Sequence, residues 1–222
     1  MARAANYLAW QSRLILPELG HRVVEVGCGV GNFTNKLLDR ELVLTTDVEP
    51  ACIERLCQRY ADQPQLHAFV AEPVSEAFAG LARFRPDSCV CTNVLEHIQD
   101  DRAALHAMAA ILQPHGRIVL WVPAFQALFG PLDRQLQHFR RYRRRDMTRL
   151  AEATGLRIIK THYVNAVGFG LWWASTHLLR QQSLTGIQIA IFDRLVVPWL
   201  SALETMAPPP FGQSLFAVLE KR

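Results

Sequence analysis

The chain has 222 residues, half of them hydrophobic and one fifth charged, with 12 Gly, 12 Pro and five Cys. This composition excludes a disordered, fibrous or low-complexity protein and suits one globular domain. Five of the 24 basic residues fall within residues 140–145, and without them the formal net charge of +4 becomes −1. The basic excess is therefore local. This argues against a nucleic-acid partner, because proteins that bind nucleic acids usually spread such charge over a face.

The cysteines and the N-terminus indicate a cytoplasmic protein. Five is an odd number of cysteines and their spacing matches no zinc pattern, so we expect reduced thiols. Residues 1–13 lack the continuous apolar core and the cleavage site of a secretory signal. The most apolar stretch, residues 163–179, contains polar residues and two glycines. We expect it to be partly buried or interfacial rather than to span a membrane.

Residues 1–21 are expected to form an N-terminal helical segment, after which short β-branched runs alternate with helical patterns up to residue 122. This alternation is typical of βαβ units in a parallel sheet. One helix is sharply delimited, because Asp100 or Asp101 can cap its start and a Pro-His-Gly sequence at 114–116 ends it. Its apolar face comprises Ala104, Leu105, Met108, Ile111 and Leu112. The expected strands are 22–26, 42–46, 66–71, 88–93 and 117–122.

The pattern changes after residue 123 to a connection rich in arginine and aromatic residues. A short helix over about 145–154 and a strand over 157–164 follow it. Residues 165–206 are helical in period and rich in tryptophan, and three prolines at 208–210 close the segment before a last strand over 214–219. No repeat or flexible linker separates these parts. We therefore expect one domain on which the aromatic insertion packs as a lid.

The sequence V-V-E-V-G-C-G-V-G-N-F-T runs from the first strand into an expected helix and places Gly27, Gly29 and Gly31 in the turn between them. Ligands of open α/β sheets bind at this edge, where glycine lets the backbone approach closely. The last glycine of a dinucleotide fingerprint would fall at Asn32, and the Lys-Ser/Thr pair of a phosphate-binding loop is missing. An acid, Glu25, precedes the loop. The alternative is a tight turn without a ligand.

The segment E-V-G-C-G-V-G resembles the first motif of the class I S-adenosylmethionine-dependent methyltransferases. The resemblance implies S-adenosylmethionine as cofactor and S-adenosylhomocysteine as product. It also implies cofactor contacts from Glu25, Gly27, Cys28, Gly29 and Gly31. The physical chemistry agrees, because this cofactor carries a sulfonium and an ammonium group and no pyrophosphate, so a neighbouring carboxylate is tolerated.

Acids after the next two strands complete the expected cofactor site. Asp47 ends the second strand, where a carboxylate can accept hydrogen bonds from both ribose hydroxyls; the alternative is a helix cap. Val48 follows it and is expected in the same site. In the family an acid after the third strand meets the adenine amino group. Glu72 is the corresponding residue here, although aspartate is more usual.

The segment C-T-N-V-L-E-H resembles the N-V-L-E-H segment of the subgroup that contains the ubiquinone-biosynthesis O-methyltransferases. By this resemblance Asn93 and Val94 line the methionine end of the cofactor, and Glu96 and His97 lie near the substrate side. His97 is then a general base, a metal ligand with Glu96, or a residue whose hydrogen bonds hold the loop. No complete His/Cys/carboxylate ligand set is evident from the sequence, so no metal is expected.

The segment L-D-R-Q-L-Q-H-F-R-R-Y resembles the D-x-x-x-G-H-x-R-R-Y motif of a branch of bacterial methyltransferases, with Gln137 where glycine is usual. The functional interpretation is a substrate-facing loop in which Arg140 and Arg141 grip a carboxylate or phosphate. In that loop His138 or Tyr142 lies near the acceptor. The alternative is the solvated start of a helix. The matching residues are Asp133, His138, Arg140, Arg141 and Tyr142.

Two adjacent tryptophans, Trp172 and Trp173, stand out in the insertion. They are interpreted either as lid and core packing or as the wall of an apolar acceptor pocket. A third interpretation is peripheral contact with a membrane interface beside the arginine run.

These patterns predict an α/β protein with the Rossmann-like class I methyltransferase fold. Its seven-stranded sheet is mostly parallel, with an antiparallel last strand and a helical, aromatic-rich insertion before that strand. Residues 1–222 form one methyltransferase domain. After the N-terminal segment its parts are a cofactor-binding core (22–122), a substrate loop with helix and strand (123–164), the lid (165–210) and the last strand (211–222).

The expected reaction is transfer of the sulfonium methyl group, by in-line displacement, to an oxygen, nitrogen or carbon atom of a small-molecule or lipid-like acceptor. A base is more useful for a hydroxyl acceptor than for an amine, and His97, His138 and Tyr142 are the candidates. The alternative is a protein that binds S-adenosylmethionine as a sensor or uses the fold for a non-methylating reaction.

Overall fold

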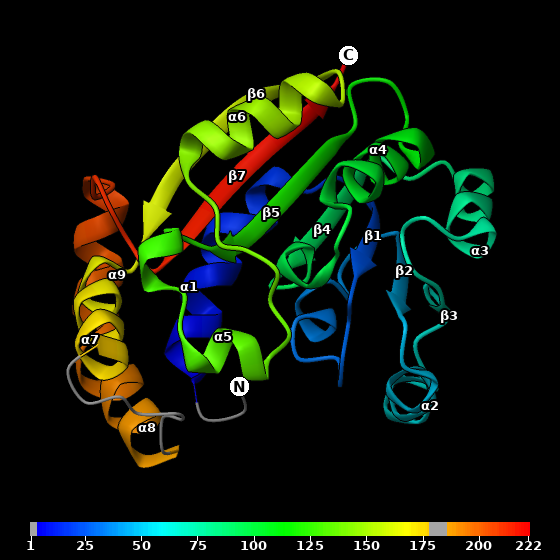
Figure 1. The fold of residues 1–222 in the computed structure, drawn as a ribbon. Coiled ribbons are helices and arrows are strands. Elements are labelled where there is room, and N and C mark those ends of the chain that lie inside the picture. Colours follow the sequence, from blue (N-terminus) through cyan, green and yellow to red (C-terminus); the bar gives the residue numbers. More distant parts are fainter. Residues whose placement is uncertain (1–3, 178–185) are drawn as a thin grey trace.

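A seven-stranded sheet forms the centre of the computed structural model, which describes residues 4–177 and 186–222 (Figure 1). The strand order is β3-β2-β1-β4-β5-β7-β6. β1 to β5 pair in parallel, whereas β7 is antiparallel to both β5 and β6. This confirms the predicted fold. The strands are β1 (Arg22–Val26), β2 (Leu42–Asp47), β3 (Leu66–Val70), β4 (Ser88–Thr92), β5 (Arg117–Pro123), β6 (Leu156–Val164) and β7 (Ser214–Lys221).

Helices cover both faces of the sheet because side chains on its strands alternate between two apolar clusters. On β5, Ile118 and Leu120 pack with residues of α3, α4 and α6, whereas Val119 and Trp121 pack with residues of α1 and α9. The helices are α1 (Ala5–Ile15), α2 (Pro50–Arg59), α3 (Glu76–Ala79), α4 (Asp101–Ile111), α5 (Pro131–Gln135), α6 (Arg144–Ala153), α7 (Ala166–His177), α8 (Gly186–Leu195) and α9 (Val197–Met206).

The structure confirms the predicted start and apolar face of α4. The Ala103 N–H donates to Asp100 Oδ1 over 2.9 Å, so Asp100 and not Asp101 is the N-cap. All five residues of the predicted apolar face are buried against β4 and β5, and the helix ends at Ile111. The capping signal and the 3.6-residue period were therefore sufficient to define this element.

The prediction of a helix directly after the glycine loop is wrong. The structure has turns around a single 3-10 helix, Thr34–Lys36, between the loop and β2. Asn32, Thr34 and Asn35 have low helix propensity, and the Thr34 hydroxyl donates to buried Glu25 instead of facing solvent. This side-chain bond holds the segment against the end of β1.

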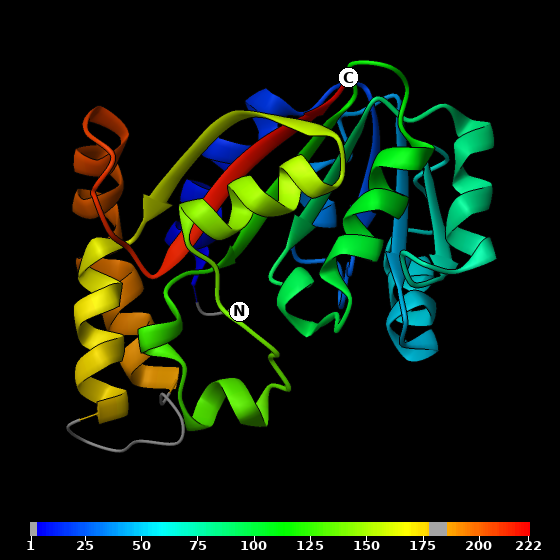
Figure 2. The same cartoon turned by 45° about the horizontal axis from the view of Figure 1, so that its top comes forward.

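The insertion between β6 and β7 is helical in the residues that the structure describes, as predicted (Figure 2). Two carboxylates attach it to the rest of the protein. Glu204 of α9 accepts 2.8 Å hydrogen bonds from the N–H groups of Asn165 and Ala166 at the start of α7. Asp193 of α8 accepts from the N–H groups of Asn6 and Tyr7 at the start of α1. The insertion is thus tied to both the sheet and the N-terminal helix.

Within the described ranges, no single helix has both the length and the apolar character needed to cross a membrane. α8 and α9 reach that length and apolar character only when they are taken together, and the two helices are bent by 51° at the break between them.

Candidate functional site

The carboxyl ends of β1 and β4 lie side by side at the point where the strand order reverses. The chain runs outward from β1 to β2 and β3 and then returns to β4 on the other side of β1. Open α/β sheets bind their ligands in the crevice outside such a reversal. The glycine loop follows β1, and the 3-10 helix η4 (Leu95–His97) follows β4. Both sequence motifs therefore flank the same crevice.

All three loop glycines adopt the left-handed conformation that glycine alone takes without strain. Their φ angles are 72° at Gly27, 52° at Gly29 and 78° at Gly31. The N–H groups of Gly27 and Cys28 donate to the Thr46 carbonyl over 2.8 and 3.0 Å, which lays the loop against the end of β2. A Cβ on Gly29 would meet no atom within 4 Å. The backbone there borders open space.

Asp47 connects this loop to the end of β2. The Gly29 N–H donates to its Oδ2 over 2.8 Å, and the Glu49 N–H donates to its Oδ1 over 3.0 Å. Each oxygen keeps capacity for a second donor. Val48 and Glu72 lie at the same edge and are exposed, Val48 by 66%. The carboxylate is therefore oriented by the backbone before any ligand arrives.

Glu25 is a buried acid beneath the glycine loop. The Thr34 hydroxyl donates to its Oε2 over 2.6 Å. Burial raises the pKa of Glu25 to about 7; the Thr34 bond opposes this effect and the charge of Asp47 adds to it. Burial also raises the pKa of the neighbouring Cys28 thiol, so this thiol stays protonated. A cation beside the loop would favour the ionised form of Glu25.

Asn93 and Val94 bring the end of β4 to the glycine loop. Asn93 has φ of 53°, a conformation that asparagine tolerates better than most residues, and its N–H donates to the Trp121 carbonyl over 2.7 Å. The Val94 side chain packs directly over Gly27. These two residues thus lie between the loop and η4.

The loop over residues 137–142 is fastened onto η4 and the residues that follow it. The Phe139 N–H donates to the Glu96 carbonyl over 2.8 Å, and the Tyr142 hydroxyl lies 3.3 Å from the Leu95 carbonyl. The Arg140 guanidinium donates to the carbonyls of Ile98 and Gln99. Gln137, at the position where the resembling motif has glycine, has φ of 59°. The left-handed turn explains the usual glycine and brings His138 toward η4.

Asp133 of α5 is fully buried and accepts four hydrogen bonds. Arg141 donates from Nε to Oδ1 over 2.8 Å and from Nη2 to Oδ2 over 3.0 Å, and the Gly130 N–H donates to Oδ2 over 2.9 Å. His138 Nδ1 lies 2.9 Å from Oδ1. Burial alone would raise the pKa of Asp133, but the bonds from His138 and Arg141 outweigh it and lower that pKa. The ionised carboxylate therefore requires a proton on His138 Nδ1.

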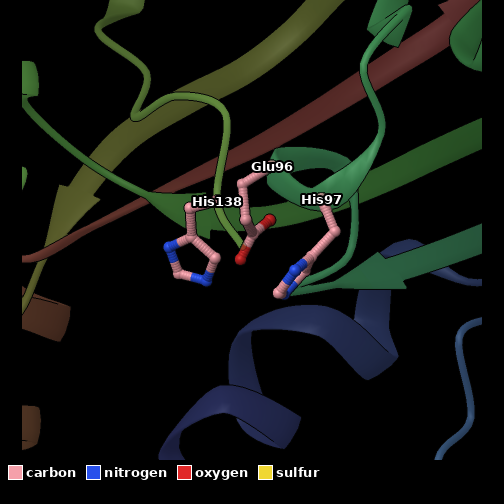
Figure 3. Close-up of side chains that lie close together, drawn as sticks. All are labelled: Glu96, His97 and His138. Carbon is pink, nitrogen blue, oxygen red and sulfur yellow. The ribbon is translucent and has the colours of Figure 1, made fainter. Parts of the chain in front are cut away.

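Glu96, His97 and His138 form a cluster at the carboxyl edge of the sheet. Figure 3 shows the Glu96 carboxylate grouped with the two imidazoles. One potential ligand atom from each residue lies within 4.8 Å of the others, and the two ring centroids are 4.5 Å apart. The sequence did not reveal this set, because His138 lies 41 residues after His97 and 42 after Glu96. The cluster is created by the tertiary structure and not by the spacing of these residues in the sequence.

The Glu96 carboxylate is the most unusual group of the cluster. Its exposed fraction is 0%, and neither oxygen has a hydrogen-bond partner among the described residues. Burial raises the pKa of Glu96 to about 8, which nearby Arg141 opposes. Partial desolvation and the neighbouring His138 lower the pKa of His97, whose side chain reaches solvent at the mouth of the cluster.

The other predicted substrate and catalytic residues have partners within the protein. Tyr142 is buried and its hydroxyl donates to Asp101 over 2.9 Å; Arg140 Nη1 also contacts this carboxylate over 2.8 Å. Arg141 binds Asp133 and lies over the Trp172 ring, whose Nε1–H donates to the Leu128 carbonyl. Trp173 is 45% exposed on the same helix. The guanidinium grip on an anionic acceptor stays a prediction, while these contacts give both arginines a structural role.

The comparisons with known proteins agree with this geometry. Residues 2–161 match the family described as a methyltransferase domain. The chain belongs to this family, and its fold and motifs place it among the class I S-adenosylmethionine-dependent methyltransferases, whose cofactor is S-adenosylmethionine.

The ubiquinone biosynthesis O-methyltransferase of Alkalilimnicola ehrlichii is 27% identical over 101 residues, which are 45% of this chain and 40% of that protein. The chain thus spans less than half the length of that relative. Two solved structures share the fold. The N-methyltransferase NodS from Bradyrhizobium japonicum with S-adenosylhomocysteine has a TM-score of 0.60 at 18% identity, covering 95% of this chain and 85% of NodS. The [4+2]-cyclase SpnF has a TM-score of 0.63 at 14% identity, and the match covers 95% of this chain and 79% of SpnF.

We expect alanine at Gly27 and at Gly29 to have different effects. A Cβ on Gly27 would lie 2.3 Å from Val94 Cγ2, so steric overlap adds to the left-handed backbone penalty. We expect Gly27→Ala to lower the free energy of unfolding by about 3 kcal/mol. Gly29→Ala should lower the free energy of unfolding by only about 1–2 kcal/mol, the cost of the left-handed backbone alone. Its Cβ would meet no other atom, because it would extend into the open space beside Asp47. Urea unfolding followed by circular dichroism measures both; equal losses would contradict the packing described.

Proposed function

We propose that this protein transfers the methyl group of S-adenosylmethionine to a small-molecule or lipid-like acceptor bound beside the Glu96–His97–His138 cluster. One observation carries the proposal: two buried or half-buried acids, Glu25 and Asp47, flank a left-handed glycine loop that borders open space at the strand reversal. A cofactor with a cationic end and a ribose fits this arrangement. A pyrophosphate would lie against two acids.

Each part of the cofactor has a candidate partner among these residues. The Glu25 carboxylate offers charge compensation for the cationic methionine end, on the side where Asn93 and Val94 end β4. Asp47 has lone pairs for the ribose hydroxyls. Glu72, exposed after β3, is the candidate for the adenine amino group. The space beside Gly29 supports this placement, because a backbone without Cβ admits the cofactor closely.

The chemical step requires alignment more than activation. A lone pair of the acceptor attacks the methyl carbon, the carbon–sulfur bond breaks, and its electrons return to sulfur, which leaves as the neutral thioether of S-adenosylhomocysteine. Because the positive sulfur is already a good leaving group, the protein has to bring the nucleophile into line and exclude water. A hydroxyl acceptor must also lose its proton. His97 and His138, whose ring centroids are 4.5 Å apart, are the candidates to receive it.

The proposal is tested with S-adenosylmethionine labelled in its methyl group and a panel of phenols, carboxylic acids, amines and isoprenoid lipids. Label in any extracted acceptor supports methyl transfer. Cofactor binding with the label retained on the cofactor across the panel would favour the second candidate, a non-methylating use of the fold. The structural likeness to a [4+2]-cyclase is the observation behind that candidate.

Cofactor affinity should depend on pH through Glu25. The pKa of Glu25 is about 7, and a bound cation favours the ionised form, so binding strengthens as pH rises through 7. We expect about a tenfold gain in affinity from about pH 6 to about pH 7.5, measured by calorimetry. Glu25→Gln keeps an acceptor for Thr34 and should flatten the dependence. An unchanged slope in that variant would assign the titration to another group.

The insertion supports a lipid-like acceptor reached from a membrane surface. Ile187, Ile191 and Leu195 lie four residues apart on α8, and Trp199 and Leu203 continue an apolar surface on α9. Trp199 is 77% exposed. Exposed apolar surface of this extent marks an interaction site, and its two helices are apolar enough to lie in an interface.

We expect the protein to float with vesicles of phosphatidylethanolamine and phosphatidylglycerol. Serine at both Trp199 and Leu203 should weaken vesicle binding at least tenfold, because each large apolar side chain contributes about 1.5–3 kcal/mol on burial. Ile159→Ser, at an exposed apolar residue of β6, is the matched control and should bind as the unmodified protein does. Equal flotation of all three proteins would remove the insertion from membrane contact.

A further inference from the structure

We propose that Glu96, His97 and His138 bind one divalent transition-metal ion of the zinc class. The proposal deepens the proposed function, because the ion would lie where the acceptor is expected. Three independent observations carry it: the convergence of the three side chains, the unpartnered buried carboxylate, and the hydrogen bond that orients His138.

The convergence is close to what a metal needs. Zinc ligands lie about 2.0–2.2 Å from the ion, so they are separated from one another by about 3.3 Å in a tetrahedral site. The ligand atoms here lie within 4.8 Å of one another. His97 is exposed and can rotate, whereas Phe139 N–H and the Glu96 carbonyl hold the backbones of η4 and the His138 loop together over 2.8 Å. A small side-chain rotation closes the site.

The Glu96 carboxylate is a buried group without compensation. It has no hydrogen-bond donor among the described residues, and the nearby Arg141 guanidinium is already engaged in two bonds to Asp133. Buried carboxyl groups are normally hydrogen-bonded or bound to a metal ion. Figure 3 shows the carboxylate grouped with the two imidazoles, and the proposed cation would lie among the three side chains.

Asp133 prepares His138 as a ligand. The 2.9 Å contact from Asp133 Oδ1 to His138 Nδ1 places the proton on Nδ1 and leaves the lone pair on Nε2, the nitrogen on the side of Glu96 in Figure 3. A carboxylate behind the distal nitrogen of a histidine is the usual support of a metal ligand. The Asp133 residue of the motif is therefore a positioning residue in this site.

The ligand set selects the metal and the acceptor. Two imidazoles with one carboxylate suit zinc, iron(II) or manganese(II), whereas magnesium and calcium prefer oxygen ligands throughout. Three protein ligands leave a position open for an exogenous oxygen. A hydroxyl bound there loses its proton to solvent more readily, because the ion stabilises the resulting oxyanion. The site therefore favours an oxygen acceptor, such as a phenol or a carboxylate, over an amine.

The test is isothermal titration calorimetry, in which zinc chloride is added to the chelator-treated full chain in the absence of S-adenosylmethionine. Cobalt(II) absorption is the second readout, because ligand-field bands report nitrogen and oxygen coordination directly. We expect one ion per chain. Glu96→Gln and His138→Asn should each weaken zinc binding at least tenfold. His106→Gln, at an exposed histidine of α4 outside the cluster, is the matched control and should leave it unchanged.

Thermal unfolding in chelator establishes that the variants fold, and cofactor calorimetry on the same samples reports on the proposed function separately. Zinc binding of equal strength in all variants would overturn the proposal, and would point to a site such as the exposed Cys57. No stoichiometric binding of zinc, cobalt or manganese by the unmodified protein would overturn it as well. If the cofactor still binds in that case, methyl transfer stands and the imidazoles act without a metal.

Discussion

Replacing Asp133 by alanine is expected to lower the free energy of unfolding by about 3–5 kcal/mol. The carboxylate is fully buried and accepts two bonds from Arg141, whose side chain is also buried. The substitution leaves that guanidinium without its counter-charge and removes the acceptor of the Gly130 N–H. Urea unfolding followed by circular dichroism measures the loss.

A double substitution separates the charge effect from a general loss of packing. Arg141→Met removes the partner, so adding it to Asp133→Ala should recover part of the stability, because no buried charge is then left unpaired. If Asp133→Ala costs less than about 1 kcal/mol, the buried pair described here does not hold the loop in solution.

Asp47→Ala is expected to weaken S-adenosylmethionine binding about 100-fold. The carboxylate is proposed to accept the ribose hydroxyls, and bonds to a charged acceptor contribute about 1.5–3 kcal/mol each. In the unmodified protein the Gly29 N–H donates a hydrogen bond to Asp47 Oδ2 over 2.8 Å. The variant loses this bond, so the loop has one fixed contact fewer. Isothermal titration calorimetry gives the affinity directly.

Glu49→Ala is the control for a change in local charge, because Glu49 is an exposed acid two residues further along. It should bind the cofactor within about twofold of the unmodified protein, since exposed charges contribute little. Comparable losses in both variants would show that Asp47 acts through its charge alone and makes no bond to the ribose.

The sheet could be predicted from the sequence because its signals are local. The central strands are short runs rich in apolar and β-branched residues, and Asp100 marks the start of α4 with a cap that the structure contains. Asp47 and Glu72 were expected at one edge because the carboxyl ends of parallel strands meet there. The same reasoning gave a wrong prediction for the segment after the glycine loop. There the Thr34 hydroxyl donates a hydrogen bond to Glu25, a tertiary contact that the periodicity of the sequence does not reveal.

The cluster could be predicted only in part. The motifs singled out His97 and His138 separately, but their approach depends on the Phe139 N–H bond to the Glu96 carbonyl and on the left-handed turn at Gln137. Gln137 did carry a signal, since the resembling motif has glycine there. The inward direction of Arg141 follows from the burial of Asp133, which sequence alone does not show.

The central claim is that the crevice at the strand reversal binds S-adenosylmethionine. Calorimetry of the cofactor-free protein with S-adenosylmethionine, run beside NAD, tests it most directly. The structure predicts one site for S-adenosylmethionine and none for NAD, whose pyrophosphate would lie against Glu25 and Asp47. Binding of NAD with equal strength, or no binding of S-adenosylmethionine by folded protein, would contradict the account.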